Sequence, residues 1–299
     1  MTEKEHRSGF VSIVGRPNVG KSTLLNRLVG RKVAIVSDRP QTTRHRILSV
    51  LTLPEAQIVF LDTPGIHKPR HQLGEYMVKV ALGTLREVDL ILFLVEAHAA
   101  FGAGDGFILE RIKEAGTPAI LCINKADLVP RKSLLPLIDD LQHKHDFRAI
   151  VPVSALTGEN TDRLVEAVAA ELPPGPRYYP AETVTDQPEQ LVIAELIREK
   201  ILQLTREEVP HGVAVVVEEM VPRPRDLFYI RAVVYTERES HKGILVGQGG
   251  QMLKKIGRLA REEIEALFGS RVYLDLWVKV RPHWRREEAF LRHFGYLPE

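Results

Sequence analysis

A glycine-rich loop near the start of the chain restricts the fold more than any other feature. The stretch Gly15–Ser22, GRPNVGKS, matches G-x-x-x-x-G-K-[ST]; an apolar run at Phe10–Val14 precedes it and a helical pattern at Ser22–Val29 follows it. Glycines in such a strand–loop–helix unit let backbone N–H groups turn toward phosphate oxygens, and the helix N-terminus adds partial positive charge. We therefore expect an α/β domain with a phosphate site at this loop.

Apolar runs and helical patterns alternate through the first half of the chain. The apolar runs are short and continuous, as expected of parallel strands that are buried on both faces. They lie at Phe10–Val14, Ile58–Leu61, Leu90–Val95, Ala119–Ile123 and Ala149–Val153. The helical patterns lie at Ser22–Val29, Leu73–Leu85, Gly106–Glu114, Leu134–His143 and Thr161–Glu171. This order predicts a mainly parallel sheet with helices on both faces.

A proline-rich stretch, LPPGPRYYP at Leu172–Pro180, resists any regular element and separates two halves of different character. We predict a first domain at residues 1–171, a linker at 172–181 and a second domain at 182–299. The second domain should contain a helix, two consecutive strands, a glycine-rich loop, a long helix, a strand and a short terminal helix. The five longer elements are expected at Glu189–Leu204, Val213–Met220, Leu227–Thr236, Gln251–Phe268 and Val272–Val280. An α+β architecture follows.

Composition excludes several classes of protein. Lys and Arg number 41 against 39 Asp and Glu, so any nucleic-acid surface must be local. Cys122 is the only cysteine, which excludes an intramolecular disulfide and a cysteine metal site. The first ten residues, MTEKEHRSGF, lack the apolar region of a signal peptide, and the longest apolar run, Leu90–Val95, is too short to span a bilayer. We expect a cytoplasmic location.

Residues around the phosphate loop indicate binding of a nucleoside triphosphate with Mg²⁺. Lys21 would supply positive charge to the β- and γ-phosphates, and the Ser22 hydroxyl would ligate Mg²⁺. The motif Asp62-Thr63-Pro64-Gly65 follows a strand, where the carboxylate could reach Mg²⁺ through water and the Gly65 N–H could meet the γ-phosphate. Ligands bind at the carboxyl ends of strands in open α/β sheets.

Two further strand ends indicate guanine. In Asn124-Lys125-Ala126-Asp127, the aspartate could accept hydrogen bonds from N1 and N2 of guanine, donors that adenine lacks. Ser154-Ala155 follows the next strand, where the Ala155 N–H could contact the guanine O6. The four motifs together resemble those of the small-GTPase superfamily over about residues 9–171. The resemblance implies GTP binding by Gly15, Arg16, Pro17, Asn18, Val19, Gly20, Lys21, Ser22, Thr23, Asp62, Thr63, Pro64, Gly65, Asn124, Lys125, Asp127, Ser154 and Ala155.

The segment Asp38–His45, DRPQTTRH, lies between the first two motifs. A threonine here completes the Mg²⁺ shell in GTPases, so the segment orders only with triphosphate. Thr42 and Thr43 both remain candidates, and we favour Thr43.

The residue after the DTPG motif is Ile66, where Ras-like enzymes carry a glutamine that orients the attacking water. We therefore expect slow hydrolysis, with Lys21, Thr43, Gly65 and Asn18 in catalytic roles. In several relatives an asparagine at the position of Asn18 helps hold K⁺ near the phosphates, so K⁺ is a second candidate cofactor.

A second glycine loop, VGQGG at Val246–Gly250, lacks the spacing of a nucleotide loop. It fits G-x-x-G followed by apolar Leu253 and Ile256, and it resembles a KH domain of the bacterial, type II arrangement. Such loops clamp the backbone of about four unpaired nucleotides. The stretch 242–258 carries four basic residues and no acidic one, which suits RNA phosphates. The expected RNA-binding residues are Lys242, Gly247, Gln248, Gly249, Gly250, Lys254 and Lys255.

Aromatic residues near the C-terminus are further candidates for stacking on bases: Trp277, Trp284, Phe290, Phe294 and Tyr296. Because Trp277 lies in a predicted strand, we expect it in the core instead.

The whole chain resembles the Era family of bacterial ribosome-assembly GTPases, through GRPNVGKST, PQTTRHR, DTPGI, NKADLV, IREKI and DLWVKV. The resemblance implies a P-loop NTPase G domain followed by a type II KH domain. It also implies binding of GTP and GDP, of the 3′ end region of small-subunit (16S) rRNA and of the 30S subunit during its assembly. Nothing in the sequence demands a dimer, and we expect a monomer.

The amphipathic C-terminal stretch PHWRREEAFLRHFGYLPE keeps one alternative open. A membrane-associated regulatory GTPase, peripheral to the inner face of the cell membrane, would bind protein or lipid through its second domain.

Overall fold

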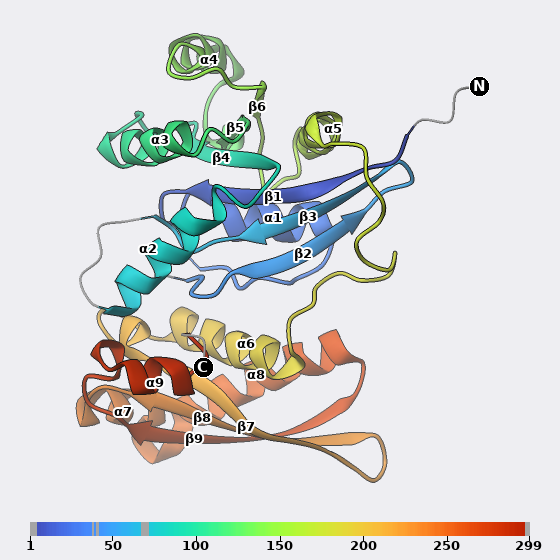
Figure 1. Ribbon diagram of the computed structural model, residues 1–299. Helices are drawn as coiled ribbons and strands as arrows, with labels where there is room; N and C mark the ends of the chain where they lie inside the picture. The colour runs from blue at the N-terminus through green and yellow to red at the C-terminus, as the bar shows by residue number, and fades with distance from the viewer. Residues whose placement is uncertain (1–4, 38, 40–41, 67–71, 297–299) are drawn as a thin grey trace. The chain divides into compact units, whose positions relative to one another are not determined.

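The computed structural model describes residues 5–37, 39, 42–66 and 72–296. They form two compact units, and the main division lies between Asp186 and Gln187 (Figure 1). Among the described residues, no helix combines the length and apolarity needed to cross a membrane.

The first unit is built on a six-stranded sheet with the order β2-β3-β1-β4-β5-β6. All neighbouring strands are parallel except β2 and β3. The strands are β1 (Arg7–Gly15), β2 (Ile47–Thr52), β3 (Ala56–Asp62), β4 (Leu90–Glu96), β5 (Ala119–Asn124) and β6 (Ala149–Pro152). The predicted mainly parallel sheet is confirmed. The prediction missed β2, a short edge strand that pairs with β3 across a tight turn.

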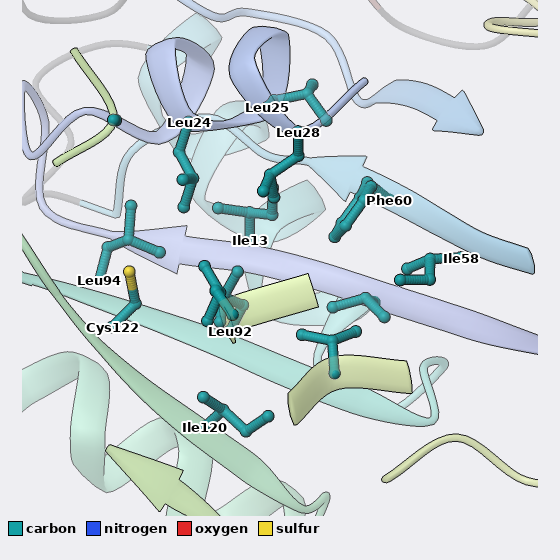
Figure 2. Packing of buried hydrophobic residues seen from close by; sticks show 14 of the residues in the cluster. Ile13, Leu24, Leu25, Leu28, Ile58, Phe60, Leu92, Leu94, Ile120 and Cys122 are labelled. Carbon is teal, nitrogen blue, oxygen red and sulfur yellow. The ribbon is translucent and has the colours of Figure 1, made fainter. Parts of the chain in front are cut away.

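Helices cover both faces of this sheet: α1 (Lys21–Val29), α2 (Gln72–Thr84), α3 (Ala103–Ala115), α4 (Leu134–Gln142) and α5 (Thr161–Glu171). In β4, Leu92 packs with residues of α1 and α5, whereas its neighbour Phe93 packs with residues of α2 and α3. Figure 2 shows Leu24 and Leu28 of α1 above Ile13 in the first of these clusters. Successive side chains of a strand point to opposite faces, so burial on both faces explains the continuous apolar runs.

The proline-rich segment lies along the first unit. Ser8 Oγ donates a hydrogen bond to the Pro176 carbonyl at 2.6 Å, and the amide nitrogens of Tyr178 and Tyr179 donate to Gln57 Oε1 at 2.7 and 3.0 Å. Farther on, the Val50 amide in β2 donates to the Val184 carbonyl at 2.9 Å. This last contact covers part of the free edge of β2, which would otherwise expose unpaired backbone groups.

The second unit contains a three-stranded sheet with the order β7-β8-β9, in which β7 and β8 are antiparallel and β8 and β9 parallel. Its elements are α6 (Glu189–Leu204), β7 (Ala214–Arg223), β8 (Leu227–Thr236), α7 (Glu239–Val246), α8 (Gln251–Phe268), β9 (Arg271–Val280) and α9 (Glu288–His293). The sequence predicted this α+β order, although it gave no bounds for α7. Residues of α6 and α8 pack on one face of the sheet.

The two tryptophans reverse one expectation. Trp277 is 56% exposed, whereas Trp284 is fully buried and donates from Nε1 to the Gly212 carbonyl at 3.0 Å. The prediction that Trp277 lies in the core is therefore wrong. In β9 the alternate residues Leu274, Leu276 and Val278 face the core cluster, so Trp277 must point to the other face.

Candidate functional site

The phosphate loop joins β1 to α1 at the carboxyl edge of the sheet. Gly20 caps α1 with a left-handed φ of 100°, and a Cβ there would lie 2.3 Å from Asn124 Nδ2. Only glycine meets both conditions. Lys21 is buried, and its Nζ donates to the carbonyl oxygens of Gly15 and Arg16 at 3.2 and 3.0 Å. Burial lowers the pKa of Lys21 to about 8, while the Asp62 carboxylate acts in the opposite direction.

Three oxygen-bearing side chains converge beside this loop. Ser22 Oγ lies 3.0 Å from Thr43 Oγ1, and it donates to Asp62 Oδ2 at 2.9 Å. Thr43 Oγ1 also donates to Asp62 Oδ2, at 3.3 Å. Burial raises the pKa of Asp62 to about 6, although Lys21 and the two hydroxyls oppose the shift. Asp62 Oδ1 is buried and has no hydrogen-bond partner among the described residues.

Thr42 lines the pocket beside the same loop but makes a different hydrogen bond. Its Oγ1 donates to the Arg39 carbonyl at 2.6 Å, whereas Thr43 is the threonine whose hydroxyl contacts Ser22 and Asp62. Asp38, Pro40 and Gln41 of the same predicted segment lie outside the described residues. Ile66 is buried and offers no side-chain hydrogen bond.

Asn124 links the phosphate loop to the Ser154-Ala155 motif. Its Nδ2 donates to the Val19 carbonyl at 2.8 Å, and its Oδ1 accepts from the Ala155 amide at 2.9 Å. A contact from this amide to guanine O6 would therefore require a shared hydrogen bond. Asp127 is exposed in a single 3₁₀ turn at Ala126–Leu128, directly after β5.

A pocket of about 290 Å³ runs along the loop. Its lining includes Asn18, Lys21, Ser22, Thr43, Gly65 and Lys125 of the predicted site. It also includes Arg39 of the Asp38–His45 segment, together with Ile35, Val36 and Ser37. The last three follow α1 without a motif, so only their position beside the loop reveals them.

Ion pairs connect Arg16 of the phosphate loop to acidic residues of β4 and α3. Arg16 Nε donates to Asp105 Oδ1 in α3 at 2.8 Å, and the Arg16 guanidinium lies 3.4 Å from the Glu96 carboxylate. Glu96 also pairs with Lys125. No sequence motif marks Asp105 or Glu96, because their roles depend on contacts between distant segments.

A second site lies in the KH-like unit, where an open groove of about 740 Å³ runs between α8 and β9. Leu253, Gly257, Leu274 and Leu276 supply an apolar lining. The charged and polar lining consists of Gln251, Lys254, Lys255, Arg258, Arg261 and the exposed ring of Tyr273. Of the predicted RNA-binding residues, Gly250, Lys254 and Lys255 line this groove, whereas the residues of β9 that line it were not predicted.

The glycines of the loop before α8 have backbone angles that explain their identity. Gly247, Gly249 and Gly250 have φ values of 71°, 58° and 79°. A Cβ on Gly247 would lie 2.8 Å from Met252 Cβ, whereas one on Gly249 would meet nothing within 4 Å. Gln248 and Gly249 are exposed, and Lys242 in α7 is partly exposed. The loop therefore leaves open space beside Gly249 for a ligand backbone.

The aromatic residues near the C-terminus pack against one another within the second unit. Trp284, Phe294 and Tyr296 are at most 6% exposed, and the Trp284 ring centroid lies 5.3 Å from that of Phe294 and 5.9 Å from that of Tyr296. These three cannot stack on bases without unfolding this end of the unit. The same packing occupies the apolar face that the membrane alternative requires.

Comparisons with known proteins agree with this geometry. Residues 10–125 match the family model described as 50S ribosome-binding GTPase, and residues 208–285 match the KH domain model. The chain is similar to the crystal structure of an Era variant from Aquifex aeolicus bound to GDP·AlF4⁻, with 47% identity over 97% of this chain and 99% of that one and a TM-score of 0.95. It is equally similar to Era in complex with MgGDPNP and nucleotides 1506–1542 of 16S ribosomal RNA, with 46% identity, the same coverage and a TM-score of 0.95.

Fold and sites together define a GTPase with a phosphate-loop G domain followed by a KH domain. The end-to-end similarity then sets the family: the chain belongs to the Era family.

Proposed function

We propose that this protein is a Mg²⁺-dependent GTPase that holds the unpaired 3′ end region of 16S rRNA in its KH groove and assists maturation of the 30S subunit. The observation that carries the proposal is the presence, on one chain, of a converging Ser22–Thr43–Asp62 cluster and a GxxG groove rich in lysine and arginine. The relative solved with both MgGDPNP and 16S rRNA nucleotides supports it.

Phosphate binding would use groups that already face the pocket. Lys21 would move its Nζ from the carbonyl oxygens of Gly15 and Arg16 to the β- and γ-phosphates. The phosphate charge would raise its lowered pKa again and keep the ammonium protonated. The Gly65 N–H would donate to the γ-phosphate.

The oxygen cluster fits Mg²⁺, which prefers oxygen ligands. Ser22 and Thr43 would hold the ion through their hydroxyls, and the unpartnered Oδ1 makes Asp62 suited to accept from an ion-bound water. The bound ion neutralises charge that develops on the phosphates. Because Thr43 belongs to a loop, its ligation would order that loop only with triphosphate.

Base recognition falls to Asp127, which would accept two hydrogen bonds from guanine. Hydrolysis should be slow, since Ile66 cannot orient water. We propose that K⁺, held with the help of Asn18, supplies charge beside the phosphates in place of an arginine.

In the second unit, the open space at Gly249 would admit the sugar–phosphate backbone, and Lys242, Lys254 and Lys255 would contact phosphates. Bases would lie against the apolar wall formed by Leu253, Leu274 and Leu276.

The test is binding of a 3′-end 16S rRNA oligonucleotide to wild type and Gly249→Asp, measured by gel shift at one salt concentration. The carboxylate would face phosphate, so we expect an affinity loss of at least about tenfold. Gly116→Asp is the matched control, because Gly116 has a φ of 71°, equally empty surroundings and a place at the end of α3. Equal losses in both variants, or no loss in Gly249→Asp, would contradict the proposal.

A further inference from the structure

One face of the sheet in the second unit is only partly covered. Residues of α6 and α8 pack on one face, and residues of alternate parity in β8 and β9 point to the other. At one end of this second face, Tyr235 is 5% exposed and its ring centroid lies 4.8 Å from that of Phe294, beside α9. Toward the other end, Tyr273 and Trp277 are 60% and 56% exposed.

Tyr229, Tyr273 and Trp277 form what we call the aromatic platform, and a single carboxylate, that of Asp275, holds two of them. Tyr229 Oη and Trp277 Nε1 donate to Asp275 Oδ2 at 3.0 and 3.1 Å. The rings of Tyr229 and Tyr273 are stacked with centroids 5.9 Å apart. Fixed rings lose little conformational entropy on binding, so the platform is preorganised for a flat ligand.

The charges around the platform favour a polyanion. Its acidic neighbours are already paired: Asp275 and Glu219 with Arg231 at 3.8 and 3.5 Å, and Glu218 with Lys279 at 3.3 Å. Arg223 and Arg271 lie in one cross-strand row with Leu227, and neither forms an ion pair with any residue that the structure describes. The surplus charge at this end is therefore positive.

We propose that the aromatic platform binds unpaired RNA nucleotides that continue out of the KH groove. Continuity carries the argument, because Tyr273 both lines the groove and stands on the platform. Trp277 lies four residues farther along β9, roughly 13 Å away. Exposed aromatics on a sheet stack two or three bases in other RNA-binding domains, with guanidinium groups nearby for phosphate. The inference rests on the proposed function of the groove.

The two tryptophans provide a direct measurement. The chain has only Trp277 and Trp284, and Trp284 is fully buried, so stacking on the platform would quench the fluorescence of Trp277 alone. The probes are an oligonucleotide of about four unpaired nucleotides, sized for the groove, and two versions extended by about six nucleotides at the 5′ or the 3′ end.

We expect one extended oligonucleotide to bind about tenfold or more tightly than the short one and to quench Trp277. Trp277→Ala should abolish that gain and leave the affinity for the short oligonucleotide unchanged, which also shows that the variant is folded. Trp277→Phe, which keeps a ring, should retain most of the gain.

Failure of the platform and failure of the groove give different results. If the short oligonucleotide does not bind wild type at all, the proposed RNA function is wrong. If it binds but neither extension adds affinity or quenching, or if Trp277→Ala retains the gain, the platform is not an RNA surface. A platform serving a protein partner would give this second result.

Discussion

The carboxyl group of Asp62 must be ionised before it can accept a hydrogen bond from a Mg²⁺-bound water. Burial raises its pKa to about 6, so the carboxyl is protonated below that pH and ionised above it. Protons and Mg²⁺ therefore compete for the same site. We expect the apparent Mg²⁺ affinity of the GTP-analogue complex to be roughly tenfold weaker at about pH 5 than at about pH 7.5, measured by titration with a fluorescent nucleotide.

The control for this pH dependence is Asp62→Asn, which does not titrate. It reports the contribution of the nucleotide's own phosphates, and its pH dependence should be the smaller of the two. Identical pH profiles for wild type and Asp62→Asn would show that the carboxyl is not the titrating group.

Asn18 is the residue on which the K⁺ proposal depends. It adopts a left-handed φ of 65° and lines the pocket. We expect GTP hydrolysis to be about tenfold faster in KCl than in NaCl, because one fixed cation offsets phosphate charge in the transition state. Asn18→Gly removes the amide and suits the left-handed φ, so it should lose the difference. Equal rates of the wild type in the two salts would end the proposal.

At the scale of elements, Asp105 joins the start of α3 to the phosphate loop. It is fully buried; Oδ2 accepts from the Gly102 amide at 3.0 Å, and Oδ1 accepts from Arg16 Nε at 2.8 Å. We expect Asp105→Ala to lower the free energy of unfolding by about 2–4 kcal/mol, since it removes a helix cap and a charge-assisted hydrogen bond. Denaturant unfolding would measure the loss.

The matched variant for this prediction is Asp139→Ala in α4, whose side chain is 77% exposed. Its unfolding free energy should change by no more than about 0.5 kcal/mol. A similarly small change in Asp105→Ala would mean that the contact between α3 and the loop contributes little.

The helices and strands also show how much of the fold could be predicted from the sequence. The bounds of α6, β8 and α8 agree with their predicted ranges, because strong sequence patterns mark all three and glycines also flank α8. The edge strand β2 was missed, since it is short and follows a polar segment. Trp277 was assigned to the core although its parity in β9 opposes that of the core residues, and Trp284 is buried by contacts within the C-terminal segment. The alternation of side chains along β9 could be predicted from the sequence, whereas the packing of α9 could not.

The same division holds for the sites. Motifs located the phosphate loop and the GxxG loop, because each depends on glycine angles and a few side chains close in sequence. The Arg16–Asp105 contact and the wall of the groove in β9 join segments far apart, so no local pattern reveals them.

At the scale of the whole molecule, one chain carries a nucleotide site and an RNA groove on separate units. If Thr43 orders its loop only with triphosphate, the GTP-bound and GDP-bound proteins differ in conformation. RNA that binds one conformation more tightly than the other would then shift the balance between them. We expect the RNA affinity in the GTP-analogue state to differ from that in the GDP state by about fivefold or more. Both must be measured at one salt concentration, since phosphate contacts make RNA affinity salt-dependent.

Two adjacent variants separate this coupling from a general effect of nucleotide. Thr43→Ala removes the hydroxyl that joins Ser22 and Asp62, so RNA affinity should become the same in both nucleotide states. Thr42→Ala removes the neighbouring hydroxyl, which donates to the local Arg39 carbonyl, so the difference should persist. Linkage adds an independent check, because RNA must change the ratio of GTP-analogue to GDP affinity by the same factor. Equal RNA affinities of the wild type in both nucleotide states would mean that the nucleotide site and the RNA groove are not coupled.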